Sequence, residues 1–340
     1  MEARTALVTH MFQVALDQLS IDEPAVHDDT DLYFEDGNII LQAEQTRFRL
    51  HKSIITARCP VFRDMLSFPQ PAQNELIDGC VVVKLPDTAN DAGLFFRAIY
   101  DYSFFEAPPA PAIVEDTLSI LSLSHKYDVP NLHRRALAHL STAHVCTLEE
   151  WDAEDSTALT FRDIEGSIAD PLLRMIEVVY EVNALWLLPT IFYLCCSHPL
   201  QKILDSPQWI SGSICETHKR TVLLGWAKQQ HETLSFQKAL IHAPTANCIT
   251  HAACAAHVRR WDVSVMAVKG DKLPGGISPL ASNGGQKFYY ERLCQPCSQS
   301  MKTMAEQKRI AFWNMLPSLF GLPGWDELMK MKAAALKCIP

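Results

Sequence analysis

The sequence predicts an α+β domain near the N-terminus, followed by a mainly α-helical domain. Short strands come first, over residues 31–34, 39–43 and 48–50, and runs of helical periodicity follow them, which is the order typical of the α+β class. The chain has 340 residues, of which 48% are hydrophobic and 20% charged, as in folded soluble proteins. Because a single core seldom grows to this length, two domains are expected.

The stretch from Phe48 to Leu66 changes period in its middle. Phe48 and Leu50 alternate with arginines at the period of two that is typical of a half-buried strand. Beyond His51 the apolar residues recur at helical spacing, and Pro60 separates two short helices. A strand therefore leads into a helix, a proline step and a second helix.

The other elements are assigned by the same periods. They are a buried-type strand over 81–85, a helix capped by Asn90, a helix through Leu118 and Leu123, and a helix that begins at Asn131. Asp36-Gly37, a strong turn dipeptide, joins the first two strands. We further expect an N-terminal helix over 5–19, a linker over 21–30 and a loop over 69–79.

The order of these residues resembles the signature of the BTB/POZ domain. The matching pieces are Phe-x-Leu-His-Lys at 48–52, Cys-Pro-x-Phe-x-x-Met-Leu at 59–66, Ala-Ile-Tyr-Asp-Tyr at 98–102 and Ser-His-Lys-Tyr-Asp-Val-Pro-Asn-Leu at 124–132. The resemblance implies a small sheet covered by helices from about Asp28 to Leu148. Residues 1–27 would then be an N-terminal helix and linker, and residues 149–340 a helical C-terminal domain.

Domains of this family dimerise, and many recruit cullin-type ubiquitin ligase scaffolds or transcriptional regulators. The resemblance therefore implies a non-catalytic interaction adaptor, which self-associates as a homodimer or docks a protein partner. It also implies a structural His51, whose ring nitrogens bond nearby backbone. Cullin binding in the family often uses a hydrophobic-x-Glu element, but Gln73-Asn74-Glu75 lacks the hydrophobic residue.

The charge is distributed unevenly along the chain. Residues 245–340 carry 12 Lys and Arg against 6 Asp and Glu, a net charge of +6, so the preceding 244 residues carry −15 of the total of −9. Scattered basic residues indicate a solvated surface more often than a nucleic-acid stripe. A DNA-associated transcription factor that uses the basic C-terminal region is kept as an alternative.

No segment of the sequence favours a membrane or a secreted location. The most apolar window, residues 184–196, is too short to span a bilayer and is interrupted by Pro189. A secretory signal pattern is also missing. We therefore expect an intracellular protein of the nucleus or cytoplasm, whose cysteines are reduced thiols or metal ligands.

The candidate site residues lie in the C-terminal third. The potential ligands are Cys248, His251, Cys254, His257, Cys294 and Cys297. A Cys-x-x-Cys pair such as Cys294-Gln-Pro-Cys297 brings two thiolates to one ion, and a second pair completes a tetrahedron. We predict a structural zinc site formed by Cys248, Cys254, Cys294 and Cys297, with His251 or His257 as substitutes.

Two other interpretations of these cysteines stay open. Free cysteines are often partly buried without any ligand. Cys294 and Cys297 would alternatively make a thiol-disulfide oxidoreductase, although such a site is expected to open a helix inside a βαβ pattern. The five residues between Cys248 and Cys254 also exceed the usual spacing of two to four.

The aromatic residues near the C-terminus are expected to form part of the second domain's own core. Trp-x-x-Leu-Pro-x-x-Phe-Gly-Leu-Pro-x-Trp runs over residues 313–325, amid Gly and Pro. Such crowding around turns predicts a tail strapped across the helical domain. With the preceding cysteine pair, this block is similar to the C-terminal half of an expanded group of fungal BTB proteins.

Overall fold

The computed structural model describes residues 25–68, 75–153, 159–161, 169–240, 245–266, 278–280 and 292–337. The chain divides into two compact units. Unit 1 comprises the residues through Phe104 together with Tyr127–Val129, and unit 2 comprises Phe105–Lys126 and the residues from Pro130 onward. The predicted helix over 5–19 lies outside the described residues. The domain limits of 28–148 and 149–340 stay a prediction.

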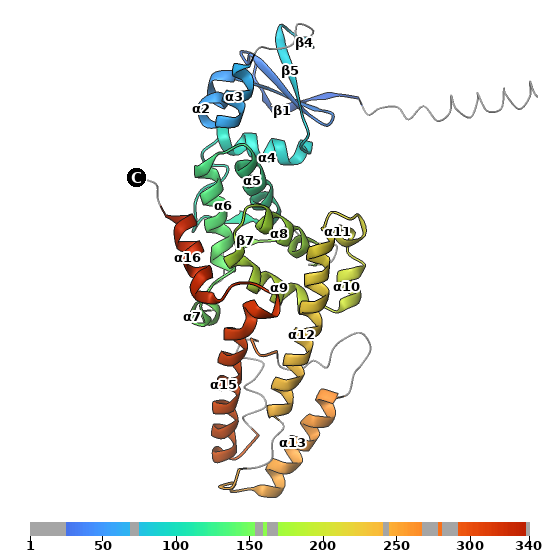
Figure 1. Cartoon of the computed structure of the whole chain (residues 1–340), viewed down its shortest axis with the longest axis vertical. Coiled ribbons are helices and arrows are strands. Elements are labelled where there is room, and N and C mark those ends of the chain that lie inside the picture. Colours follow the sequence, from blue (N-terminus) through green and yellow to red (C-terminus); the bar gives the residue numbers. More distant parts are fainter. Residues whose placement is uncertain are drawn as a thin grey trace, which may run out of the picture. The chain divides into compact units, whose positions relative to one another are not determined.

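Unit 1 contains a five-stranded sheet with the strand order β1-β3-β2-β5-β4 (Figure 1). Its strands are β1 (His27–Tyr33), β2 (Ile39–Ala43), β3 (Thr46–Leu50), β4 (Leu76–Ile77) and β5 (Cys80–Leu85). As predicted, β3 alternates: Phe48 and Leu50 are buried, and the arginines between them are half-buried. The α+β class predicted for this part of the chain is confirmed.

The turn at Asp36-Gly37 forms as predicted, but the strands it joins are not neighbours in the sheet. β1 pairs in parallel with β3, and β3 forms an antiparallel hairpin with β2. The turn crosses the end of β3 to reach β2 on the other side of that strand. Two hydrogen bonds show this: Arg49 Nε donates to the Gly37 carbonyl at 2.9 Å, and the Asn38 N–H donates to the Leu50 carbonyl. A Cβ on Gly37 would lie 2.9 Å from Arg49 Cγ, so this close crossing favours glycine.

Four local predictions in unit 1 were wrong. The expected linker over 21–30 ends inside β1, because pairing with β3 makes a strand of a polar segment from His27. The expected loop over 69–79 contains β4, which pairs with β5. β5 is half-buried over Val81–Val83 rather than fully buried. The cap of the next helix is Thr88 rather than Asn90, because Thr88 Oγ1 accepts the Asp91 N–H at 3.1 Å.

Three helices complete the described part of unit 1. They are α2 (Lys52–Arg58), α3 (Pro60–Ser67) and α4 (Ala89–Tyr100). The proline step is confirmed, since Pro60 occupies the first turn of α3, where a missing N–H costs nothing. Phe48, Phe62 and Phe96 are fully buried, and Phe96 contacts Phe48 edge-on and Phe62 at a tilt, which closes the core between sheet and helices.

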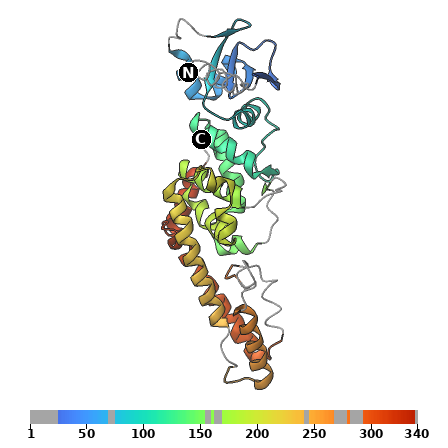
Figure 2. The ribbon, with the colours of Figure 1, turned by 90° about the vertical axis from the view of Figure 1, so that its right-hand side faces the viewer.

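Unit 2 is mainly helical, as predicted. Its helices are α5 (Val114–Lys126), α6 (Pro130–Ala143), α7 (Leu148–Asp152), α8 (Ala169–Glu181), η1 (Leu185–Leu187), α9 (Leu188–Cys196), α10 (Leu200–Leu204), α11 (Pro207–Ile210), α12 (Glu216–Leu240), α13 (His251–Met266), α15 (Gln295–Leu319) and α16 (Trp325–Leu336). Two-residue strands, β6 (Ala112–Ile113) and β7 (Leu159–Thr160), pair in parallel. α12 and α15 lie side by side in both views (Figures 1 and 2).

The most apolar window of the chain is a core helix. Eight of the nine residues of α9 are buried, and no described helix is long and apolar enough to cross a membrane. Its C-terminal carbonyls are satisfied by α12, because Gln229 Nε2 donates to the Tyr193 carbonyl and Gln230 Nε2 donates to the Cys196 carbonyl. These bonds replace the helical partners that the last turn lacks.

The C-terminal aromatic residues pack within unit 2, as predicted. Phe312, Trp313 and Phe320 are nearly fully buried, and Phe320 stacks on Phe192 of α9 at 4.6 Å. On its other side Phe320 lies against α12, where a Cβ built on Gly225 would come within 2.3 Å of Phe320 Cε1. The absence of a side chain at Gly225 therefore lets the ring reach α9.

We expect Gly225→Ala to destabilise unit 2 although alanine is the better helix former. The propensity gain is about 1 kcal/mol, whereas forcing a methyl group against a packed ring costs roughly 1–3 kcal/mol. Calorimetry should show a lowered Tm, and Phe320→Leu should restore part of the loss in the double variant. A raised Tm for Gly225→Ala alone would show that the ring moves aside without cost.

A buried histidine joins the end of α6 to α9. The His144 ring is 3% exposed, and its Nδ1 lies 3.2 Å from Thr190 Oγ1. Burial lowers the pKa of His144 to about 4, because desolvation penalises the imidazolium. The folded protein therefore holds His144 neutral in a pH range where the unfolded chain protonates it.

The stability of unit 2 should fall with acid through His144. Its contribution is fully present above pH 6.5, the ordinary pKa, and is lost progressively as pH falls toward 4. The expected loss between pH 7.5 and pH 5 is about 2 kcal/mol in the free energy of unfolding. Urea unfolding of wild type and His144→Gln at both values measures the difference. An equal fall in both proteins would contradict this role.

Candidate functional site

Four cysteines converge where α13 and α15 begin. Cys248 lies in the turn before α13, closed by its N–H donating to the Thr245 carbonyl at 2.9 Å, and Cys254 lies in the first turns of α13. Cys294 is the N-cap of α15, and Cys297 lies in its first turn. The two helix starts therefore each present two thiols, one from the cap or preceding turn and one from the helix itself.

The four sulfur atoms have the spacing of a single-ion site. All four Sγ atoms lie within 4.8 Å of one another, and Cys248 Sγ lies 3.7 Å from Cys294 Sγ. A tetrahedral zinc with Zn–S bonds of about 2.3 Å places its sulfur ligands about 3.8 Å apart. Four soft donors at this separation fit zinc, the usual ion of all-thiolate structural sites.

The protons of this cluster are held unequally. The pKa of Cys294 is lowered to about 6, chiefly because the Cys297 backbone N–H donates to its sulfur. The pKa of Cys248 is raised to about 12 by desolvation and by hydrogen bonds with the other thiols. Cys294 thus ionises first, which suits the start of a helix, where the backbone amides stabilise an anion. The lowered pKa of Cys294 contrasts with that of the single buried thiol Cys59, whose pKa burial raises to about 12.

Side chains that the sequence analysis did not include also contact the sulfurs. Thr245 Oγ1 lies 3.6 Å from Cys297 Sγ, and Thr250 Oγ1 lies 3.3 Å from Cys254 Sγ. The Cys294 N–H donates to Cys254 Sγ at 3.3 Å, which links the two helix starts directly. Thr245 is 52 residues from its partner Cys297, and a threonine four residues before a cysteine is too common to signal a contact, so the sequence predicted neither partner.

The two histidines offered as substitutes are outside the cluster. His251 is exposed and His257 is half-buried, and neither belongs to the groups of close ligand atoms found among the described residues. His251 and His257 lie three residues before and after Cys254, a spacing at which helical residues share a face, so the spacing alone does not separate them from the cysteine. The structure thus brings together the four cysteines that the spacing favoured, and their role as ligands stays a prediction.

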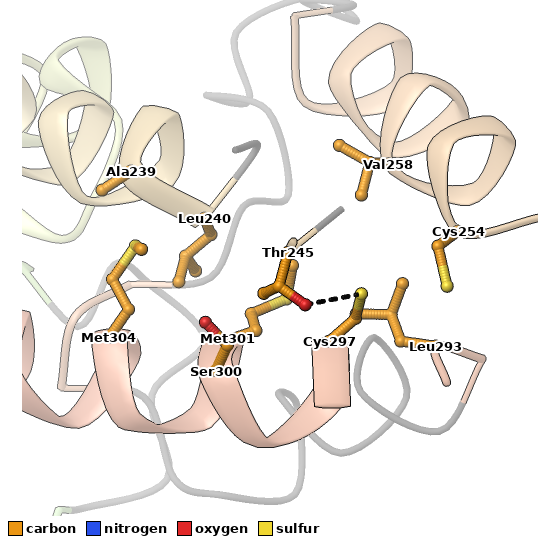
Figure 3. Close-up of a pocket in the computed structure, with 10 residues that line it drawn as sticks. All are labelled: Ala239, Leu240, Thr245, Cys254, Val258, Leu293, Cys297, Ser300, Met301 and Met304. Carbon is orange, nitrogen blue, oxygen red and sulfur yellow. Dashed lines mark hydrogen bonds between the residues drawn. The ribbon is translucent and has the colours of Figure 1, made fainter. Parts of the chain in front are cut away.

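A small apolar pocket adjoins the cysteines. Cys254 and Cys297 form one end of it, and Leu240 and Met301 line the other (Figure 3). Its volume is about 40 Å³, enough for one water-sized probe and too little for an organic ligand. It belongs to a core cluster made of Phe236, Leu240, Val258, Met301 and Ala305, which joins α12, α13 and α15.

A second group of potential ligands lies elsewhere in unit 2 and has a structural explanation. The ligand atoms of Glu177, Cys215 and His218 lie within 4.8 Å of one another. The Glu177 carboxylate accepts from the Cys215 N–H at 3.2 Å and lies 2.6 Å from His218 Nδ1. It therefore caps the start of α12 from α8, and the sequence offers no signal for this contact between distant segments.

His51 is held by side chains rather than by backbone groups. Its Nε2 lies 3.0 Å from Asp36 Oδ1, and its Nδ1 lies 3.4 Å from the Tyr100 hydroxyl. The expectation that its ring bonds nearby backbone was therefore wrong. Its backbone N–H donates to that hydroxyl at 2.8 Å, and its carbonyl accepts from the first turn of α2. These bonds fix the strand-to-helix junction, and the hydrogen bond to His51 lowers the pKa of Asp36.

Comparison with known proteins identifies the first part of the chain. Residues 34–144 match the family model of the BTB/POZ domain, so the chain contains a BTB/POZ domain. The match covers unit 1 from Phe34 together with α5 and α6 of unit 2. No curated protein and no solved structure matches the chain. A BTB/POZ domain is a protein-interaction module and is typically non-catalytic.

Proposed function

We propose that the protein is a non-catalytic adaptor. Its BTB/POZ domain self-associates or docks a protein partner, and its helical C-terminal part, held by a zinc ion, presents a second surface. The BTB/POZ match over residues 34–144 is the observation that carries this proposal. Candidate partners are a second copy of the chain, a cullin-type scaffold and a transcriptional regulator, in the nucleus or cytoplasm. The cullin-type scaffold has the least support of the three, because Gln73 stands where the hydrophobic residue before Glu75 is expected.

Zinc is proposed because the segment that holds the cysteines has little core of its own. Among the described residues, the cluster that joins α12, α13 and α15 has five buried members, a small core for three helices. A structural zinc supplies folding free energy directly, since its ligands come together only in the folded chain. Cys248 and Cys254 would hold it from α13, and Cys294 and Cys297 from α15.

Protein purified under reducing conditions should contain about one zinc per chain. The double variant Cys294→Ser/Cys297→Ser should lose it, because a hydroxyl does not replace a thiolate ligand. Metal analysis by mass spectrometry measures the content. Chelation should also speed amide exchange in α13 and at the start of α15, and leave unit 1 unchanged.

Cys80→Ser is the matched control for the zinc experiment. Cys80 is buried in β5, far in sequence from the cluster, and its sulfur donates to the Gly37 carbonyl, a bond that a serine can keep. Its zinc content should equal that of wild type. Zinc well below one equivalent in reduced wild-type protein would end the zinc proposal.

A thiol-disulfide enzyme at Cys294 and Cys297 is the second candidate function. The lowered pKa of Cys294 at a helix start favours it. Two observations favour the metal over this reading: two further thiols lie within 4.8 Å, and in the described part of the chain neither sheet places a βαβ unit around the pair. Protein that carries zinc and lacks disulfide reductase activity would decide for the metal.

The DNA-binding alternative receives less support from the structure. Among the described basic residues of the C-terminal region, Arg309 is buried and bonds Asp152, and Lys332 Nζ lies 4.0 Å from Glu150. A salt-insensitive or undetectable interaction with duplex DNA would remove this alternative.

Self-association should involve the exposed apolar face of α2 and α3. Ile54 and Val61 are 37% and 39% exposed there. Light scattering should give twice the chain mass for wild type, and Val61→Glu should shift the protein toward monomer, because a charge opposes burial in an interface. Asn90→Glu, which adds the same charge in the first turn of α4, should leave the mass unchanged. A strict monomer would remove self-association, and a pull-down then tests partner docking.

A further inference from the structure

An open cleft of about 470 Å³ lies within unit 2, away from the cysteines. It is formed by α7, the middle of α15 and the start of α16. This volume lies in the range of clefts that bind organic groups, whereas the pocket beside the cysteines is about 40 Å³. Neither the BTB/POZ match nor the metal site accounts for it.

The floor of the cleft is apolar and firmly held. Trp313 and Trp325 stack at 4.8 Å with their rings nearly parallel, and Trp325 Nε1 donates to the Trp313 carbonyl at 2.7 Å. Ile310 and Met329 line the same cleft and remain 42% and 37% exposed. The indole floor and the two exposed side chains form an apolar surface, and an apolar anchor that covers this surface is bound favourably.

The rim of the cleft is acidic. Four carboxylates line it, from Glu149, Asp152, Glu306 and Asp326, and no Lys or Arg is among its described lining residues. Two cations lie beside it: Arg309 is 4% exposed, bonds Asp152 through NH1 and NH2 and lies 3.9 Å from Glu306, and Lys332 Nζ lies 4.0 Å from Glu150. The four lining carboxylates and Glu150, set against Arg309 and Lys332, leave a charge of −3 around the floor.

We propose that this cleft binds a linear peptide of a partner protein, in which Lys or Arg residues flank an aliphatic or aromatic anchor. Charge complementarity carries the choice of occupant, because an acidic rim steers cations and rejects anions. The first 24 residues of the chain itself contain four acids and one arginine, so their charge of −3 opposes binding there. The anchor covers Ile310 and Met329 beside the half-buried Trp325 ring, and the flanking cations pair with Glu149, Glu306 and Asp326.

A displayed library of random peptides tests the proposal on the full chain. Selection should enrich peptides that contain Lys or Arg on both sides of a Leu, Ile, Phe or Trp. A fluorescein-labelled peptide with the enriched sequence should bind less tightly as salt is raised. Asp326→Lys should weaken its binding roughly tenfold, since it places a like charge beside the peptide.

Matched variants separate the cleft from general effects of charge and folding. Glu327→Lys reverses a neighbouring acid in the same first turn of α16 that does not line the cleft, so binding should persist. Ile310→Ser should weaken binding, whereas Leu224→Ser, at an exposed site on α12, should not. All four substitutions are at exposed positions, and unchanged melting curves confirm folding.

Three outcomes would overturn the proposal. The first is selection of peptides without basic residues, or of none. The second is binding that survives both Asp326→Lys and Ile310→Ser. The third is loss of self-association in those variants without any change in peptide binding, which would assign the cleft to a second copy of the chain.

Discussion

The helical unit depends on the burial of α9. A helix that is apolar on every side must be covered on every side, and α9 is covered by α8, α12, α15 and η1. The cover is also polar where it must be: Gln229 and Gln230 of α12 satisfy carbonyls at the end of α9, and Trp226 Nε1 donates to the His198 carbonyl just beyond it. These bonds set the register of α12 on α9. A shift of α12 would leave buried carbonyls unpaired, and the cost of an unpaired buried carbonyl exceeds the average net gain from a hydrogen bond.

The same constraint places the candidate metal site. α12 and α15 pack on α9 with one part of their length and pair with each other beyond it, where the described residues form a small buried cluster around Phe236 and Met301. The four thiols lie at that end. The four thiols thus adjoin a small described core, and the proposed metal crosslink between α13 and α15 would add stability there.

Features that depend on neighbouring residues could be predicted from the sequence, and features that join distant segments could not. The alternation around Phe48 and the step at Pro60 are local, and both were predicted correctly. The parallel pairing of β1 with β3 depends on a crossing over Arg49, which no local pattern contains. Spacing favoured the Cys294 and Cys297 pair, whereas the five residues between Cys248 and Cys254 exceed the usual spacing, and only the direction of each side chain separates Cys254 from His251. The acidic cleft joins residues 149, 306 and 326, so no sequence window contains it.

One helix links the two sites, and its length keeps them independent. Cys297 and Glu306 are nine residues apart on α15, which is about 14 Å along the helix axis. Between them and the C-terminus, α15 is held by contacts that need no metal: Arg309 bonds Asp152, and Trp313 and Phe320 are buried. Loss of the ion would therefore loosen the start of α15 and leave the cleft intact. An adaptor built this way can lose metal at one end without releasing a partner bound at the other.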